Sequence, residues 1–383
     1  MAFFGNDAVN RVNIHYGFVA FAEAMGLAFV LVFLLRSGVS VPLTLLAQAA
    51  IQAGRFALRP LILPLGRRFG LKPVLIGGVL SVSASYLALG QVHGLGWPLL
   101  AYLVISAIGA LFYWTAYHAY FSALGDDEHR GHQIGVREAI GAVVGIVAPL
   151  AGALALSTVG SAWAFTVVAL IQTLAALPLI GAPDVAVADE APGAWKAART
   201  GFVLFAIDGW FAAGYQIVWG VALFTTLDRS YGAYGGAMAL AGLVGAATGM
   251  TLGRHIDGGG GRRMVLVAYL VAAGVVVMRA FSLQVPIMAV VANALGALVL
   301  ALVAPVQMTP IYNLAKASPC PLRFQMASEA GWDIGCFAGC LLAAGIAAIG
   351  GSLAWAILST LPVLVLAARI LWGLYGSRNG RAA

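Results

Sequence analysis

The chain has 383 residues, of which 62% are hydrophobic and only 9% are charged. A soluble globular protein carries about a quarter charged residues, so this composition excludes a soluble fold. Apolar stretches of roughly twenty residues, the length at which a helix crosses a bilayer, recur along the chain. Because these stretches lack the alternation of a transmembrane barrel, the sequence predicts an all-α, polytopic membrane protein.

The net charge of +7 could suggest a nucleic-acid partner, but the basic residues are distributed as a topology signal. Twelve spans are predicted at 15–35, 41–64, 73–92, 97–121, 138–157, 162–181, 200–225, 234–253, 264–281, 285–309, 325–348 and 354–375. One set of connections holds most of the basic residues, whereas the other set holds Arg36 and Arg229. Cytoplasmic connections carry the excess of Lys and Arg, so both termini are expected on the cytoplasmic side. The protein is expected in a bacterial-type inner membrane.

Two similar stretches indicate an internal repeat. "GFVAFAEAMG" at 17–26 and "GFVLFAIDGW" at 201–210 lie half a chain apart, in the first and seventh predicted spans. The longest polar connection, 183–199, divides the chain into an N-terminal six-helix bundle (1–182) and a C-terminal one (200–383). Two such halves are typical of secondary transporters.

Two short basic loops lie at corresponding places in the halves. They read "GRRFGLKPVL" (66–75) and "GRHIDGGGGRRMVL" (253–266). Both resemble the inner-loop signature of the major facilitator superfamily, Gly-x-x-x-Asp-Arg-x-Gly-Arg-Arg, although Arg67 stands where that signature has Asp. The resemblance implies two pseudo-symmetric bundles around a central cavity. It also implies a role in conformational change for Arg68, Gly70, Asp257 and Arg262.

The second and eleventh predicted spans each carry a polar stripe with four-three-four spacing. The first stripe is Gln48, Gln52, Arg55 and Arg59, and the second is Glu329, Asp333, Cys336 and Cys340. A charge at this depth costs several kcal/mol in lipid, so both stripes are expected to face the protein interior. A guanidinium group suits an anion, and Arg55, Gln52 and Gln48 are therefore predicted to bind substrate.

Counting from the nearest loops places Arg59 level with Glu329, and Arg55 level with Asp333. In the superfamily these two spans face each other, so the resemblance implies that Arg59, Glu329 and Asp333 form a gate between the halves. The alternative interpretation is that each charge pairs within its own half.

Glu23 and Asp208 interrupt the two repeated stretches. Carboxyl groups in apolar surroundings can exchange protons near neutral pH, so both are predicted to couple transport to protons. The alternative is a structural carboxylate fixed by an arginine such as Arg55, or by hydroxyl groups. On the seventh span, Asp208 shares a face with Tyr215 and Trp219, which are predicted to line the substrate passage.

The fourth span contains an aromatic band, "FYWTAYHAYF" at 112–121. Aromatic bands at a membrane boundary are usually anchors. Tyr113, Trp114 and Tyr117 are instead predicted to contact substrate, together with Gln307 of the tenth span.

The sequence therefore predicts a secondary transporter that moves a small anionic solute, coupled to protons and acting as a monomer among membrane lipids. One alternative is a proton-driven exporter of amphipathic or drug-like compounds. Another is a transport-inactive sensor or assembly factor on the same fold. No nucleotide-binding loop, catalytic set or complete metal-ligand set is recognisable, so neither an enzyme, a cofactor nor a metal is expected.

Overall fold

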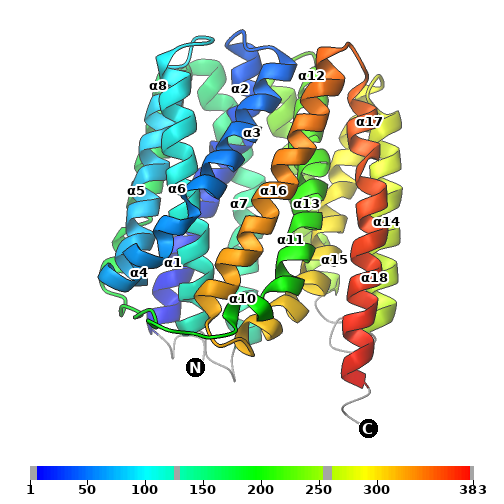
Figure 1. Cartoon of the computed structure of the whole chain (residues 1–383). Coiled ribbons are helices and arrows are strands. Elements are labelled where there is room, and N and C mark those ends of the chain that lie inside the picture. The colour runs from blue at the N-terminus through cyan, green and yellow to red at the C-terminus, as the bar shows by residue number, and fades with distance from the viewer. Residues whose placement is uncertain (1–6, 125–129, 253–260, 380–383) are drawn as a thin grey trace.

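The computed structural model describes residues 7–124, 130–252 and 261–379, and every regular element in these ranges is a helix (Figure 1). Nine helical stretches within them are long and apolar enough to cross a membrane. They are Asp7–Arg36, Leu71–Leu89, Trp97–Phe121, Ser161–Ile180, Arg199–Thr226, Gly261–Phe281, Pro286–Lys316, Pro321–Ala348 and Leu353–Gly376. The three other expected spans are also helical, at Val41–Phe69, Arg130–Thr158 and Tyr231–Leu252.

The first part of the chain forms one group of helices. Its elements are α1 (Asp7–Met25), η2 (Leu27–Phe29), α2 (Val30–Arg36), α3 (Val41–Leu58), η3 (Arg59–Leu61), α4 (Ile62–Phe69), α5 (Leu71–Leu89), α6 (Trp97–Leu124), α7 (Arg130–Thr158), α8 (Ser161–Leu174) and α9 (Leu177–Ile180). Within this group α5 packs on α6 and α8, and α1 packs on α7.

The short helix α10 (Ala194–Ala197) precedes the second group. That group comprises α11 (Arg199–Ala212), the π-helical segment η4 (Ala213–Val218), α12 (Trp219–Thr226), α13 (Tyr231–Leu252), α14 (Gly261–Phe281), α15 (Pro286–Lys316), α16 (Pro321–Ala348), α17 (Leu353–Leu358) and α18 (Thr360–Asn379). The main contacts between the two groups are those of α3 with α16 and of α7 with α13.

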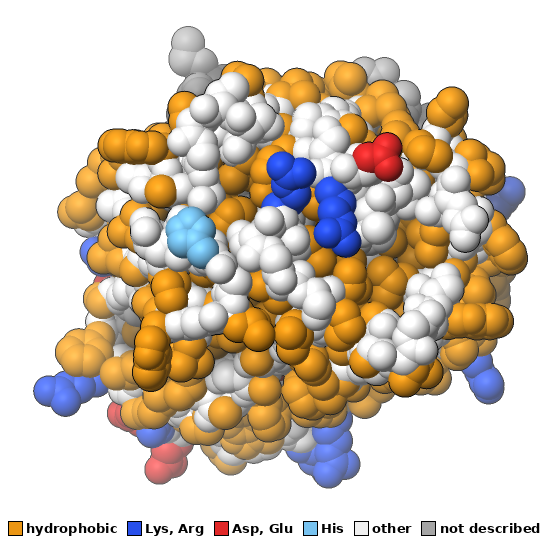
Figure 2. Space-filling view, turned by 90° about the horizontal axis from the view of Figure 1, so that it is seen from above, with side chains coloured by type: hydrophobic (Ala, Val, Ile, Leu, Met, Phe, Trp, Pro, Cys, Tyr) orange, Lys and Arg blue, Asp and Glu red, His pale blue; other side chains and the backbone are white. Residues whose placement is uncertain are grey.

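Both chain termini lie at one end of the helices, and the segment between the two groups also runs across that end (Figure 1). We call this end the termini side and the opposite end the far side. Seen from the far side, the molecule presents few charged side chains (Figure 2).

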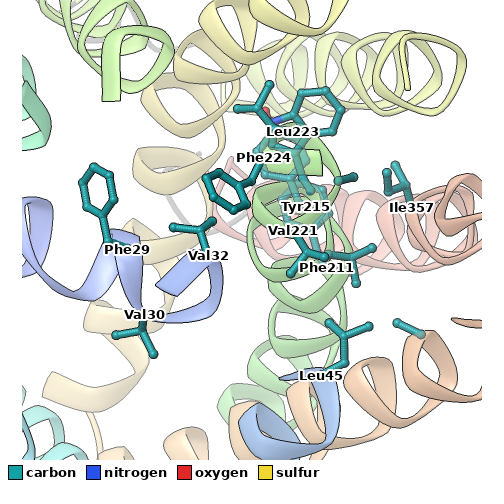
Figure 3. Close-up of a cluster of buried hydrophobic side chains, with 14 of the residues drawn as sticks. Phe29, Val30, Val32, Leu45, Phe211, Tyr215, Val221, Leu223, Phe224 and Ile357 are labelled. Carbon is teal, nitrogen blue, oxygen red and sulfur yellow. The ribbon is translucent and has the colours of Figure 1, made fainter. Parts of the chain in front are cut away.

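Apolar side chains join the two groups on the far side. The ring of Phe29 lies 5.5 Å from that of Tyr234, and the Tyr234 hydroxyl donates to the Ala28 carbonyl at 3.3 Å. Figure 3 shows Phe29 and Val32 of the first helix group opposite Phe224 of the second. Ring and aliphatic packing therefore closes the far side, together with Arg36, whose Nη1 donates to the Arg229 carbonyl at 3.5 Å.

Small residues allow α7 and α13 to approach closely. A Cβ atom added at Gly242 would collide with the backbone of Gly145, and one added at Gly235 would meet the side chain of Ala153. Such small-residue faces allow membrane helices to pack backbone against backbone. This approach holds the two groups together at a second line of contact besides α3 and α16.

We expect Gly242→Ala to lower the thermal unfolding midpoint of the purified protein in detergent. Overpacking costs about 1–3 kcal/mol, which exceeds the gain of about 1 kcal/mol in helix propensity. Gly236→Ala is the matched control, since nothing lies within 4 Å of a Cβ added there on the same helix. Equal midpoints for the two variants would contradict the close approach.

Candidate functional site

The two polar stripes meet where α3 crosses α16. Arg55 lies between both acids, with Nη2 3.1 Å from Glu329 Oε2 and Nε 3.1 Å from Asp333 Oδ1. The Arg59 guanidinium pairs with the other oxygen of Asp333. All four side chains are buried, and Asp333 has no exposed surface. Two positive and two negative charges thus compensate one another across the boundary between the helix groups. We call these four side chains, Arg55, Arg59, Glu329 and Asp333, the charge cluster.

The pairing differs in part from the expected one. The expected contact between Arg55 and Asp333 is present. Among the described residues, however, Arg59 pairs with Asp333 and not with Glu329, which pairs with Arg55 instead. Arg59 begins the 3₁₀ turn η3, directly before Pro60. A 3₁₀ turn rises about 2.0 Å per residue and changes the rotation of the chain, so the side chain leaves the α-helical register.

Neighbouring side chains orient the two guanidinium groups. Arg59 Nη1 donates to Thr115 Oγ1 of α6 at 3.2 Å, and Arg55 Nη1 donates to Gln52 Oε1 at 3.2 Å. The Trp332 ring lies 5.2 Å from the Arg55 guanidinium carbon, and Gln48 is half-buried one turn beyond Gln52. The polar face of α3 therefore continues from the charge cluster towards the far side.

The rings of the aromatic band of α6 contact one another, with Tyr113 5.0 Å from Trp114, but the two sides of this band face different surroundings. The Trp114 ring stacks on His118 at 5.6 Å, and His118 Nε2 lies 3.9 Å from Glu329 Oε1, which places this side beside the charge cluster. The rings of Tyr113 and Tyr117 stack on each other at 5.6 Å and are fully buried within the first helix group. Trp114 therefore contacts His118, which faces Glu329, whereas the two tyrosines belong to a hydrophobic cluster of the first group.

Two predicted residues of the second helix group come together. Asp208 of α11 is half-buried and hydrogen-bonds with Gln307 of α15 and Trp332 of α16. The Tyr269 hydroxyl of α14 donates to Gln307 Oε1 at 3.2 Å. An acid, an amide and a phenol from three helices thus form a polar group around a partly accessible carboxyl.

Glu23 lies on α1 and is half-buried. Among the described residues, no ion pair connects it to an arginine, because Arg55 is engaged by Glu329 and Asp333. The alternative in which Arg55 fixes Glu23 is therefore not observed.

Tyr215 and Trp219 surround a buried cation, Arg279 of α14, that the sequence analysis overlooked. The guanidinium carbon lies 3.9 Å from the Tyr215 ring centre and 4.7 Å from that of Trp219. The signal was an arginine inside the apolar run "VVVMRAF" at 275–281, since ionisable residues within spans are rare and usually functional.

The loop residues lie at the termini side. Gly70 has a φ of 83°, which an L side chain rarely adopts, and the next two amides donate to the linker: Leu71 N to Val185 O at 3.0 Å and Lys72 N to Asp184 Oδ1 at 2.9 Å. Arg68 stacks on its neighbouring phenylalanine. In the second half, Arg262 Nε donates to the Trp372 carbonyl at 3.2 Å. Asp257 lies outside the described residues.

The linker also supplies an acid near the position where the family signature has one. Arg67 Nε lies 3.4 Å from Asp189 Oδ1, and Arg323 Nη2 donates to the Asp189 carbonyl at 2.7 Å. One linker residue thus lies between basic side chains of α4 and α16, which would otherwise repel each other. Sequence reasoning missed this role because it depends on where the linker runs.

Comparison with known proteins agrees with this architecture. The profile described as Major Facilitator Superfamily matches residues 16–319, which is more than half of the chain, so the chain belongs to this superfamily. Its fold is similar to the crystal structure of the human organic anion transporter MFSD10 (TETRAN), with a TM-score of 0.71 and 15% identity over 95% of this chain and 99% of that one. No curated protein sequence matches the chain significantly.

The family and the fold confirm the expected class of protein. The chain is an all-helical, multi-pass membrane protein of the major facilitator kind. It is a secondary transporter rather than an enzyme, and transporters of this kind bind a small-molecule substrate.

We expect Asp333→Asn to destabilise the protein by about 3–5 kcal/mol, because it leaves two buried arginines facing one carboxylate. The double variant Arg59→Gln/Asp333→Asn should lose less than the sum of the single variants, by about 0.5–3 kcal/mol of coupling. Thermal unfolding in detergent measures both effects. Strictly additive losses would contradict the pairing.

Arg67→Gln is the matched control for that cycle. Arg67 of α4 likewise forms an ion pair, with Asp189 of the linker 183–199, but the Asp189 side chain is 90% exposed. Exposed pairs contribute about 0–1 kcal/mol, so the control should leave the unfolding midpoint nearly unchanged.

Proposed function

We propose that this chain carries a small anionic solute across the inner membrane by alternating access, with transport coupled to protons. The observation that supports the anion is the position of Arg55. It is buried on the boundary between the helix groups, and carboxylates of the other group compensate its charge. A guanidinium that already binds carboxylates in the closed arrangement offers the same donors to a carboxylate, phosphate or sulfonate of a solute.

Alternating access gives the arginines two sets of partners. In the proposal, residues 1–182 and 200–383 move as two bundles joined by 183–199, and opening of the termini side separates α3 from α16. An uncompensated buried charge costs about 3–5 kcal/mol, so the arginines need water or an anion when Glu329 and Asp333 withdraw. The solute thus replaces the gate carboxylates at Arg55, with Gln52 and Gln48 as further hydrogen-bonding partners on the same stripe of α3.

Proton coupling is assigned to Glu23 and Asp208. Both are half-buried carboxyl groups in the two repeated stretches, Glu23 at the seventh position and Asp208 at the eighth. Asp208 hydrogen-bonds with Gln307 and Trp332, and Trp332 stacks on Arg55. A change in the charge of Asp208 can therefore reach the substrate arginine through one shared tryptophan.

The sidedness follows from the basic residues. The termini side carries Arg67, Arg68, Lys72, Lys196, Arg199, Arg262, Arg263, Lys316 and Arg323, whereas Arg36 and Arg229 lie on the far side. By the positive-inside rule, we assign the termini side to the cytoplasm.

A second candidate is an exporter of amphipathic compounds. The observation in its favour is that Trp114 and Trp332 adjoin the charge cluster, where they can contact an apolar ring attached to an anionic group. The human neighbour is an organic anion transporter, but at 15% identity that likeness concerns the fold, so the anion proposal rests on the arginines.

We expect small organic and inorganic anions to raise the thermal unfolding midpoint of the purified protein, and Arg55→Ala to abolish this rise. Loss of the guanidinium removes the donors that bind the anion. Arg229→Ala, an exposed arginine on the far side, is the control that should keep the response. Stabilisation by cations alone would refute the anion proposal, and absence of flux in proteoliposomes would favour a transport-inactive sensor.

We expect Glu23→Gln and Asp208→Asn to abolish uptake driven by a pH gradient while preserving exchange of the stabilising anion between the two sides. An amide cannot carry the proton, but the bundles can still exchange bound solute. Glu23→Asp keeps a carboxyl and should retain part of the driven uptake. The measurement is uptake and counterflow in proteoliposomes. Full gradient-driven uptake by both amide variants would remove these carboxyls from the coupling mechanism.

A further inference from the structure

Arg279 is placed differently from the arginines of the gate. It lies in the last turn of α14, two residues before the helix ends at Phe281, and only 3% of its surface is exposed. An arginine so near a helix end usually extends its guanidinium outward to water. This one turns inward, where Nη1 donates to the Tyr215 carbonyl at 2.6 Å and Nε approaches the Ala292 carbonyl at 3.5 Å.

The surrounding backbone is shaped to hold the guanidinium. Tyr215 belongs to the π-helical segment η4, and the wider π turn leaves its carbonyl available to an outside donor. Gly296 of α15 leaves the necessary space, since a Cβ atom there would collide with Arg279 Nη2. The Tyr215 hydroxyl donates to the Gly296 carbonyl at 3.0 Å, and Trp219 Nε1 donates to Asn293 Oδ1 at 3.0 Å. Three helices therefore build the site before any ligand arrives.

In the part of the chain that the structure describes, no acid forms an ion pair with Arg279, whereas Arg55 and Arg59 share two carboxylates. Carbonyl dipoles and the faces of Tyr215 and Trp219 stabilise the cation. One full positive charge thus remains inside the second helix group.

This charge lies on the same wall as the polar group around Asp208. Tyr215 and Asp208 are seven residues apart on one face of the α11–η4 helix, about 10 Å along its axis at 1.5 Å per residue. Gly296 and Gln307, which contact Arg279 and Asp208 respectively, lie on one stripe of α15. The wall is therefore positive towards the far side and acidic nearer the middle.

We propose that Arg279 is a charge-selecting residue: its uncompensated cation favours anionic over neutral or cationic solutes that enter the passage from the far side. The inference rests on the proposed anion transport and adds a residue that decides the charge of the substrate. A unit charge about 10 Å from a bound anion, at an effective dielectric constant of about 20, changes the affinity for that anion roughly tenfold. Arg279 acts through this field, while Arg55 makes the direct contact.

Three solutes with one ring and different charges test the proposal: benzoate, benzamide and benzylamine. Binding to the purified full-length protein is measured by thermal shift across a concentration series. The wild type should prefer benzoate. Arg279→Gln should weaken benzoate binding roughly tenfold and leave benzamide unchanged, whereas Arg279→Lys should retain most of the preference. A purely structural role would weaken benzoate and benzamide equally, and that outcome would overturn the proposal.

A second variant keeps the test valid if the first does not fold. Asn293→Asp leaves Arg279 in place and adds a carboxylate of equal size one turn from Gly296, so it should also reduce the preference for benzoate. Arg229→Gln, which removes an exposed charge on the same side, should leave it unchanged. A wild type that prefers benzylamine would refute the anion transport itself. A benzoate preference that survives both Arg279→Gln and Asn293→Asp would refute only the role of Arg279.

Discussion

The structure depends on the compensation of buried charge where α3 crosses α16. In an apolar interior neither an arginine nor a carboxylate is stable alone, so Arg55, Arg59, Glu329 and Asp333 bind the two helix groups together. A partial separation would strand all four charges at once. In the proposed transport cycle this contact has two favourable arrangements, one closed with its own carboxylates and one open with water or a solute in their place, and such bistability suits a gate.

The two sides of the molecule are closed by different kinds of interaction. On the far side Phe29, Tyr234 and their neighbours exclude water through apolar contact. On the termini side the linker residue Asp189 lies between Arg67 and Arg323, beneath the buried ion pairs. A charged solute competes directly with ion pairs but not with apolar packing, so the chemistry of the proposed substrate is expected to act on the termini side.

The chain also holds arginines in two distinct environments. Arg55 is neutralised by acids, and in the proposed cycle its charge becomes available only when the helix groups separate. Arg279 is held by a π-helical carbonyl and two aromatic rings, so its charge persists in the arrangement described. The exposure of the Arg55 charge would thus depend on conformation, whereas the Arg279 charge does not depend on a carboxylate partner. Because Trp332 contacts Arg55 and hydrogen-bonds with Asp208, the conditional charge is adjacent to a titratable group.

The sequence by itself determined the helical membrane fold, because so few charges cannot cover a soluble surface. Four-three-four spacing also identified both polar stripes, since charges at lipid depth must face inward. Only the tertiary structure decided their partners: the 3₁₀ turn at Arg59 shifts it towards Asp333. It also buried Tyr113 but left Trp114 half-buried beside His118, joined Asp208 to Gln307 and turned Arg279 inward. Spacing along one helix fixes which residues share a face, but the rotation and crossing of helices distant in sequence fix what that face meets.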